Sequence, residues 1–218
     1  MQYRRFLFGN RNEVFILKEE KQKVGQIKKK KIRETTKKCF LTKGFQSTTM
    51  KNVITEIGMN KEGVYHHYAS TIEMLKDLML DGNEYRNSLI TEYLAHNRSK
   101  DKYQQMGDIL VDKSLADTDL MRLYTLLLQA KSYSEELEEL YQELKFNTTN
   151  ELSLIAKQLG IKTDIFKDGF LVNYINAMIL SSQVLCARNS FSKHKKYIKE
   201  TMVNYIVDID KSKSKHIV

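Results

Sequence analysis

The sequence predicts an all-α protein, and two features of its composition and patterning support this prediction. The chain has 218 residues and contains no proline, so long helices can run without interruption. Its apolar residues recur three and four positions apart instead of alternating, which is the helical period. A chain of this length can form one large or two small domains with a real core. We therefore expect an all-α fold with one large or two small domains.

Residues 48–75 predict two short helices joined by a tight turn, with a third helix starting directly after them. Thr49 is a good N-cap for the first helix, because its hydroxyl can accept a hydrogen bond from a free backbone N–H. Gly58 ends this helix, since glycine readily adopts the left-handed conformation that closes a helix. Asn60 then caps the second helix, which we expect over residues 61–68.

The second of these helices carries two chemically different faces. Val64 and Tyr68 lie four residues apart and share one face, which we expect to be buried. Lys61, Tyr65 and His66 point elsewhere, and their side chains can donate hydrogen bonds. The major groove of DNA admits one α-helix, so a helix that presents these groups suits groove binding. The alternative, in which these side chains merely coat a helix surface, stays open.

Two further signals lie close to the turn. Gly63 falls inside the second helix, where a glycine costs about 1 kcal/mol relative to alanine. Ser70 and Glu73 have the spacing of a capping box, with Ser at the N-cap and Glu at the third helical position. They open a helix over residues 71–96 that is long enough to connect two domains.

Positive charge is concentrated directly before the helix-turn-helix stretch. The whole chain has a formal net charge of +9, and residues 21–43 contain ten Lys or Arg residues and one Glu. Four of the lysines are consecutive: Lys28, Lys29, Lys30 and Lys31. A basic segment beside a groove-reading helix suits a polyanion, because each neutralised phosphate releases counterions. We favour phosphate or minor-groove contact by these lysines over the alternative of a solvated helix start.

These residues resemble the tetracycline-repressor (TetR/AcrR) family of bacterial transcriptional regulators. The resemblance covers about a fifth of the chain and consists of Ile32, Thr35, Thr36, Cys39, Phe40, Gly44, Phe45, Thr48, Thr49, Val53, Gly58, Val64, Tyr65, His66, His67, Tyr68, Ser70 and Leu75. It implies a helix-turn-helix DNA-binding domain in which Thr49 and Tyr65 bind phosphates. It also implies that Lys61 and His66 approach base edges. The full set that we expect at the DNA adds Lys51, Asn60 and His67.

The helical pattern and the resemblance divide the chain into four parts. Residues 1–25 precede the family pattern as an N-terminal extension, either disordered or partly helical, and the sequence does not assign its role. Residues 26–70 form the DNA-binding domain, whose first helix we expect over residues 26–43. Residues 71–210 form a helical bundle that, by resemblance, binds an effector and dimerises. The polar residues 211–218 form a frayed tail.

The bundle is expected to contain five helices after the long connecting one. Their predicted ranges are 101–114, 117–131, 134–159, 164–189 and 192–210. The last two are apolar on more than one face, as helices buried on several sides are. In the family, two C-terminal helices pair with those of a second subunit, so the resemblance implies a homodimer through these helices. Small side chains would allow close approach: Ala177, Ser181, Ser182 and Ala187.

The bundle also offers aromatic, methionine and amide side chains from which a pocket for an unidentified small-molecule effector could be built. This candidate set is Tyr85, Met106, Tyr124, Gln129, Tyr133, Asn173, Tyr174 and Asn176. Residues of this kind at helical spacing more often belong to an ordinary core. Asn173 and Asn176 are the stronger candidates, because a buried amide needs hydrogen-bond partners.

We interpret the chain as a cytoplasmic, ligand-released homodimeric repressor that binds a palindromic operator in double-stranded DNA, and activation stays open. The residue spacing places no catalytic triad, no paired carboxylates and no phosphate-binding glycine loop, so we expect neither enzyme activity nor a cofactor. We expect no metal site, since the adjacent residues His66 and His67 point about 100° apart on a helix. The apolar runs are too short for the ~20 residues that span a membrane.

The alternative is an all-α interaction protein whose basic N-terminal region binds acidic partners or a membrane surface without reading a DNA sequence. Membrane-surface binding requires an apolar face opposite the lysines. Residues 21–31 offer only Val24 and Ile27 for such a face, which is less than a large apolar face. Binding to liposomes would separate this alternative from DNA binding.

Overall fold

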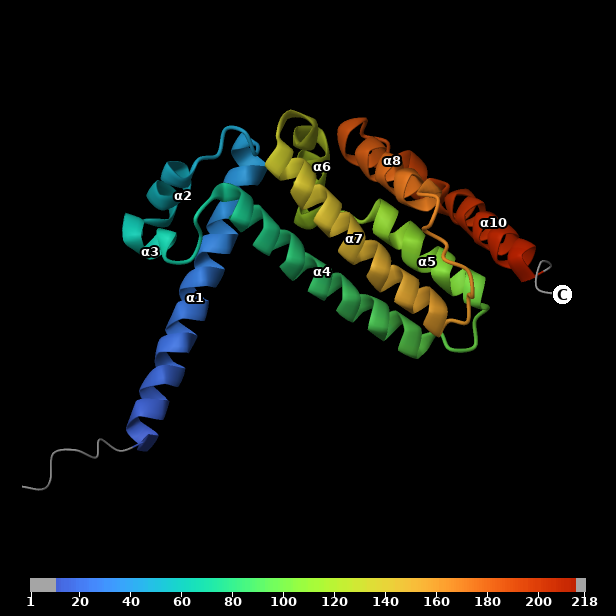
Figure 1. Cartoon of the computed structure of the whole chain (residues 1–218). Helices are drawn as coiled ribbons and strands as arrows, with labels where there is room; N and C mark the ends of the chain where they lie inside the picture. The colour runs from blue at the N-terminus through green and yellow to red at the C-terminus, as the bar shows by residue number, and fades with distance from the viewer. Residues whose placement is uncertain (1–10, 215–218) are drawn as a thin grey trace, which may run out of the picture. The chain divides into compact units, whose positions relative to one another are not determined.

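The computed structural model describes residues 11–214 of the chain, and it describes side chains for residues 22–212. Figure 1 shows that the regular elements of this described part are helices. The predicted all-α class is therefore confirmed. The chain divides into two compact units, Met1–Met74 and Leu75–Val218.

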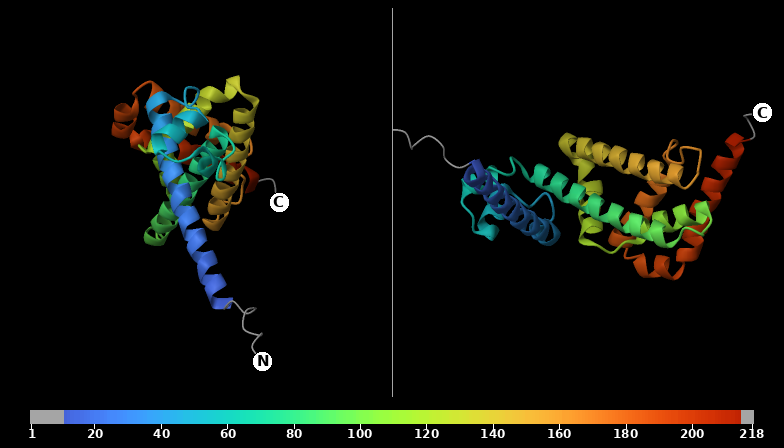
Figure 2. Two further views of the ribbon diagram at one scale, coloured as in Figure 1. Left: turned by 90° about the vertical axis from the view of Figure 1, so that its left-hand side faces the viewer. Right: turned by 90° about the horizontal axis from the view of Figure 1, so that it is seen from below.

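The first unit is built from α1 (Arg11–Lys43), α2 (Met50–Ile57), α3 (Lys61–Tyr65) and the first residues of α4 (Thr71–His96). In Figures 1 and 2, α2 lies against the C-terminal half of α1. Buried side chains from all four helices or their ends form one core: Ile32, Cys39, Val53, Ile57, Val64, Tyr68 and Met74. This core holds α2 and α3 in place and leaves their opposite faces to solvent.

α1 is longer than the sequence predicted. It begins at Arg11, whereas we expected the first helix to start at residue 26. Residues 11–25 of the predicted extension therefore continue the helix, which no proline interrupts. Residues 1–10 lie outside the described part of the chain.

α3 is shorter than predicted, because it ends at Tyr65 and not at Tyr68. The N–H groups of His67 and Tyr68 both bond to the carbonyl oxygen of Val64, at 3.0 and 3.1 Å, so the chain closes there as a turn. His66 keeps right-handed helical dihedral angles of −62° and −27°. Val64 and Tyr68 are both buried, as their shared face predicted.

The second unit contains the remainder of α4 and six further α-helices. These are α5 (Lys102–Leu115), α6 (Asp119–Ala130), α7 (Glu135–Gln158), α8 (Phe170–Val184), α9 (Arg188–Lys193) and α10 (Lys195–Ser214), with a 3-10 turn at Lys131–Tyr133. α8 and α10 both pack on α5. α4 lies beside α7 in Figure 1, and the ion pairs Lys76–Glu143 and Arg86–Glu151 join the two helices at 2.7 and 2.5 Å.

The last helices differ in their ends from the predicted ranges. α8 begins at Phe170, not at residue 164, because Gly169 before it has a left-handed φ of 77°. The carboxylate of Asp168 accepts a hydrogen bond from the N–H of Phe170 at 2.9 Å, which supports this start. A short helix, α9, separates α8 from α10. α10 continues through residues 211–214 of the predicted tail, and residues 215–218 lie outside the described part.

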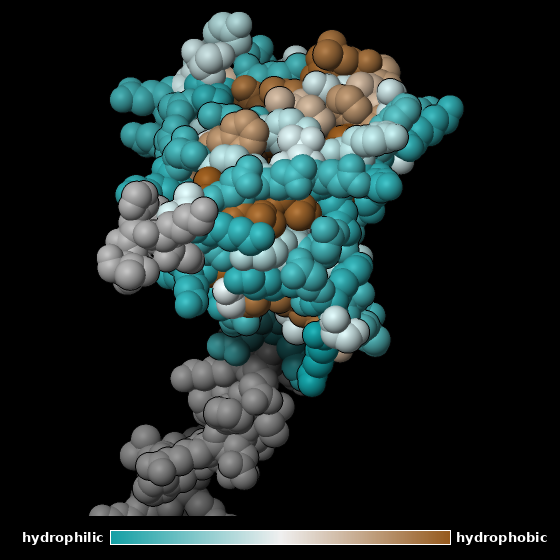
Figure 3. Space-filling view, turned by 90° about the vertical axis from the view of Figure 1, so that its right-hand side faces the viewer, coloured by the Kyte–Doolittle hydropathy of each residue, from teal (hydrophilic) through white to brown (hydrophobic). Residues whose placement is uncertain are grey.

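Apolar surface remains uncovered near the C-terminal helices. Val184, Leu185 and Tyr197 are 48%, 72% and 65% exposed. On the face shown in Figure 3, apolar side chains form patches between polar ones. Within residues 11–214, none of the helices combines the length and the apolar character needed to cross a membrane.

Candidate functional site

Side-chain caps fix the start of both helices of the helix-turn-helix. The hydroxyl of Thr49 accepts a hydrogen bond from the N–H of Asn52 at 3.2 Å, and the Asn52 side chain accepts one from the N–H of Thr49 at 2.9 Å. Gly58 closes α2 with a left-handed φ of 66°. Asn60 Oδ1 accepts from the N–H of Gly63 at 3.0 Å and so caps α3. All three of these roles were predicted from the sequence.

The glycine inside α3 has a steric reason. A Cβ atom at Gly63 would lie 2.6 Å from Oδ1 of Asn60 and 3.3 Å from Cε of Met59. A side chain at this position would therefore displace the asparagine that caps the helix. The expected cost of the glycine is offset in part by the hydrogen bond that its small size permits.

The start of α4 differs in one detail from the predicted capping box. The N–H of Glu73 donates to the hydroxyl of Ser70 at 3.1 Å, as expected. The Glu73 carboxylate accepts from the N–H of Ala69 at 2.5 Å, one residue before the predicted donor. Both bonds satisfy backbone groups that a helix start leaves free.

α3 presents Lys61, Tyr65 and His66 on its solvent side. All three are exposed, and the buried Val64 holds the helix from the other side. The ammonium of Lys61 lies 5.5 Å from the centroid of the Tyr65 ring, within the range of a cation–π contact. The structure therefore brings Lys61 and Tyr65 together, and it leaves His66 exposed at the C-cap of the same helix.

His67 follows this group in a half-buried position. Its ring meets that of His66 edge to face, with 5.2 Å between centroids. Burial lowers the pKa of His67, and the neighbouring His66, Lys29 and Lys28 lower it further. His67 is therefore neutral at physiological pH and can offer a hydrogen bond but no charge.

The four consecutive lysines do not share a surface. α1 runs through all of them, so their side chains point about 100° apart from one to the next. The ammonium of Lys29 lies 5.4 Å from the centroid of the Tyr68 ring, which places it on the side of α1 that faces α3. Lys28 is exposed and close enough to His67 to affect its pKa, whereas the exposed Lys30 is turned about 200° away from Lys28 along the helix.

The remaining predicted DNA contacts lie at the start of α2. Lys51 is exposed in the first turn of α2, where its side chain can reach a phosphate. Thr49 is exposed too, but its hydroxyl already bonds to Asn52. It accepts from the N–H of Asn52 and donates to Oδ1 of the same residue at 2.7 Å. The DNA contacts of both residues stay predictions.

Comparison with known proteins identifies this helix-turn-helix. The sequence pattern of the family described as bacterial regulatory proteins, tetR family, matches residues 32–78. Residues 32–78 form a tetR-family domain. A relative with the same kind of domain is the uncharacterized HTH-type transcriptional regulator YfiR of Bacillus subtilis (strain 168), which is 39% identical over 67 residues. That match covers 31% of this chain and 31% of YfiR, so it relates the tetR-family domain and not the remainder.

Solved structures extend the similarity in fold to most of the chain. Salmonella enterica GusR matches with a TM-score of 0.60 and 15% identity, over 84% of this chain and 95% of GusR. A transcriptional regulator from Rhodococcus sp. Rha1 matches with a TM-score of 0.54 and 16% identity, over 84% of this chain and 96% of its own. At 15% and 16% identity, these matches show a shared fold for the tetR-family domain and the bundle.

The second unit of the chain contains a cavity of about 50 Å³, lined by residues of α4, α5, α6, α7 and α8. Two of the predicted pocket residues, Tyr124 and Asn176, line it. The hydroxyl of Tyr124 donates to Oδ1 of Asn176 at 3.1 Å, and Nδ2 of Asn176 donates to the hydroxyl of Tyr141 at 3.3 Å. The amide that the sequence singled out is therefore satisfied by two tyrosines.

The other six predicted pocket residues lie elsewhere. Met106 is fully buried in the core, while Tyr85 and Tyr133 are 63% and 80% exposed. Gln129 and Asn173 are exposed, and Tyr174 stacks on Phe170 at 5.8 Å between ring centroids. In their place the structure shows polar lining residues that were not predicted: Asn83, Lys113, Lys145, Thr148 and Thr149.

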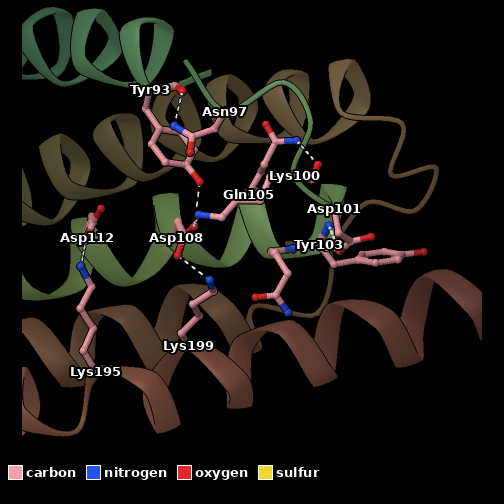
Figure 4. A network of polar contacts seen from close by, with 11 residues as sticks. Tyr93, Asn97, Lys100, Asp101, Tyr103, Gln105, Asp108, Asp112, Lys195 and Lys199 are labelled. Atoms are coloured by element: carbon pink, nitrogen blue, oxygen red, sulfur yellow. Dashed lines mark hydrogen bonds and ion pairs between the residues drawn. The ribbon is translucent and has the colours of Figure 1, made fainter. Parts of the chain in front are cut away.

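A separate polar network ties three helices of the bundle together (Figure 4). Asp108 accepts hydrogen bonds from Tyr93 at 2.7 Å, Lys100 at 2.6 Å and Lys199 at 2.6 Å. Burial raises the pKa of Tyr93 to about 12, and its bond to Asp108 contributes to the rise. The groups of this network satisfy one another, which indicates a structural role. Among the described residues, no group of three His, Cys, Asp or Glu side chains is placed to hold a metal ion.

Proposed function

We propose that this protein is a homodimeric transcriptional repressor that a small molecule releases from its operator. The observation that carries the proposal is the solvent side of α3, a short capped helix on which Lys61 contacts Tyr65 and after which His66 is exposed at the C-cap. Such a helix fits the major groove, and its side chains can donate to base edges and phosphates. The match of residues 32–78 to the tetR family supports the same assignment.

The exposed apolar surface of the last helices supports a homodimer. Leu185 and Tyr197 are 72% and 65% exposed, and large apolar side chains of this kind are typical of surfaces that a second subunit covers. A two-fold dimer presents two copies of α3 to half-sites about one helical turn, some 34 to 36 Å, apart. The operator is therefore expected to be a palindrome.

A fluorescence-anisotropy titration of the full chain tests this proposal. The labelled duplex is the intergenic DNA upstream of the protein's own gene, and the competitor is unlabelled DNA of scrambled sequence at two salt concentrations. The proposal expects saturable binding that survives the competitor, with two chains per duplex by light scattering. Equal displacement by the scrambled DNA would contradict it.

One observation favours a second candidate function, binding to an acidic membrane surface. Val24 and Ile27 of α1 are 51% and 68% exposed beside the lysine run. A basic helix with an apolar side can lie on anionic lipid. Sedimentation with vesicles of phosphatidylcholine and phosphatidylserine tests it, and binding to vesicles without sequence-specific DNA binding would favour this function.

A further inference from the structure

The cavity in the second unit carries an uneven charge. Two lysines line it, Lys113 of α5 and Lys145 of α7, and none of the described side chains that line it is acidic. Glu151 lies close to Lys113, but its carboxylate is paired with the guanidinium of Arg86 at 2.5 Å. The positive charge at the cavity is therefore not balanced by a lining carboxylate.

Lys113 is the more unusual of the two lysines. Within the described part of the chain its amine makes no hydrogen bond or ion pair, and its neighbours Leu110 and Ser114 on α5 are buried. Burial, together with the charge of Arg86, lowers the pKa of Lys113 to about 7 against the opposing effect of Glu151. An amine held in this way destabilises the fold, and such groups concentrate at functional sites.

We propose that the cavity is the effector site of this regulator and that it binds a small monocarboxylate, whose carboxylate pairs with Lys113. Lys145 adds a second cation at the same cavity, and Tyr124 and Asn176 supply neutral polar groups. Leu152 and Ile175 line the cavity with apolar surface for the rest of the molecule. The regulatory meaning of this site rests on the proposed function, but its ligand class does not.

The size of the cavity limits the ligand. Its volume of about 50 Å³ is well below the roughly 150 Å³ of an engineered cavity that binds benzene. A carboxylate with a short apolar chain is therefore the best match, and one of more than a few carbons has to displace lining side chains. Such displacement moves residues of five helices, which gives the ligand a means to change the bundle.

Binding should also take up protons. The titratable and charged groups that face Lys113 are Arg86 on α4, Glu151 and Lys145 on α7, and Tyr124 on α6. Near neutral pH the unliganded amine is divided between its charged and neutral forms. A bound carboxylate favours the charged form, so affinity should decline as the pH rises above neutrality.

The test compares charged and neutral ligands of equal shape on the full chain. Butanoate and hexanoate, with butanamide and hexanamide as neutral isosteres, are titrated by calorimetry at pH 7.5 in two buffers of different ionisation enthalpy. We expect the acids to bind at least about tenfold more tightly than the amides, which corresponds to one charge-assisted hydrogen bond. The two buffers should report proton uptake.

Three variants give the test its controls. Lys113→Met keeps the apolar stem and should abolish both the preference for the acid and the proton uptake, while raising the melting temperature. Lys113→Arg should keep the preference for the acid without the proton uptake. Lys157→Met removes an exposed lysine of α7 that does not line the cavity and should change neither.

Equal affinities for acids and amides would overturn the assignment, as would a preference that survives in Lys113→Met or the binding of no compound in the series. The same preparations are titrated with the upstream DNA. Acid-selective binding without operator binding would keep the ligand site and contradict the proposed function. Operator binding without acid selectivity would keep the proposed function and contradict the ligand site.

Discussion

Replacing Lys28 by Gln should weaken DNA binding and reduce its dependence on salt, whereas Lys30→Gln should change neither. The two lysines are of the same type and lie in the same helix. They differ in direction, because a separation of two residues turns the side chain by about 200°. Lys28 lies on the side of α1 near His67, beside α3, and Lys30 points away from it.

The size of the effect follows from counterion release. One lost phosphate contact reduces the slope of log K against log[salt] by about 0.9 for B-DNA. Between 50 and 200 mM salt, this slope change alters the affinity ratio of variant to parent by about 3.5-fold per chain. In a two-fold dimer the slope change doubles to about 1.8 and the ratio to about 12-fold.

Fluorescence anisotropy at four or more salt concentrations measures both slopes on the same duplex. A scrambled duplex provides the sequence control, because a phosphate contact should lose affinity on both DNAs alike. Equal slopes for the two variants would refute the inference that only one side of α1 meets the DNA. A larger effect of Lys30→Gln would reverse the assignment of the sides.

Three further predictions follow from the described geometry. Lys61→Ala and His66→Ala should each weaken operator binding at fixed salt with little change in melting temperature, and unchanged binding by both would remove α3 from the groove. Gly63→Ala should gain about 1 kcal/mol of helix propensity and lose a similar amount of N-cap energy, so its net effect on stability should be small. Gly25→Ala has open space around its Cβ and should stabilise the chain in urea unfolding. Equal gains in stability for the two variants would contradict the steric reason for Gly63. Burial raises the pKa of Asp210, but its hydrogen bonds lower this pKa by more, so that the net shift is downward. The stabilisation by the Asp210 carboxylate is therefore present above about pH 4 and is lost as the pH falls further. Asp210→Asn should flatten that acid loss, and identical urea midpoints of variant and parent from pH 7 to pH 3 would exclude the role.

The starts of α2 and α3 and the end of α2 could be predicted because local chemistry decides them. Thr49 and Asn60 cap helices through bonds to residues only three positions away. Gly58 needs a left-handed backbone whatever packs around it. Each of these features depends on a few neighbouring residues, so the sequence contains the whole reason for it.

Long-range packing decided the features that the sequence did not show. The direction of Lys29 follows from the contact with Tyr68, a residue distant in the chain, so a run of four lysines gave no means to choose a side. Tyr133 was a plausible pocket residue by type, but the 3-10 turn after α6 leaves it 80% exposed. Residue type and helical spacing do not specify which side of a helix its neighbours leave open.

Lys113 is different, because a signal for it was present in the sequence. Met106, Ile109 and Leu110 define the buried side of α5, and position 113 continues this side three and four residues later. A lysine where the pattern requires an apolar residue costs stability, unless a partner or a ligand compensates the charge. The described residues place no such partner at its amine, while they do place a cavity there. For the proposed ligand site, a charged residue on the apolar side of a helix is therefore a better guide than residue type alone, because Met106 belongs to the buried core and Tyr85 and Tyr133 are exposed.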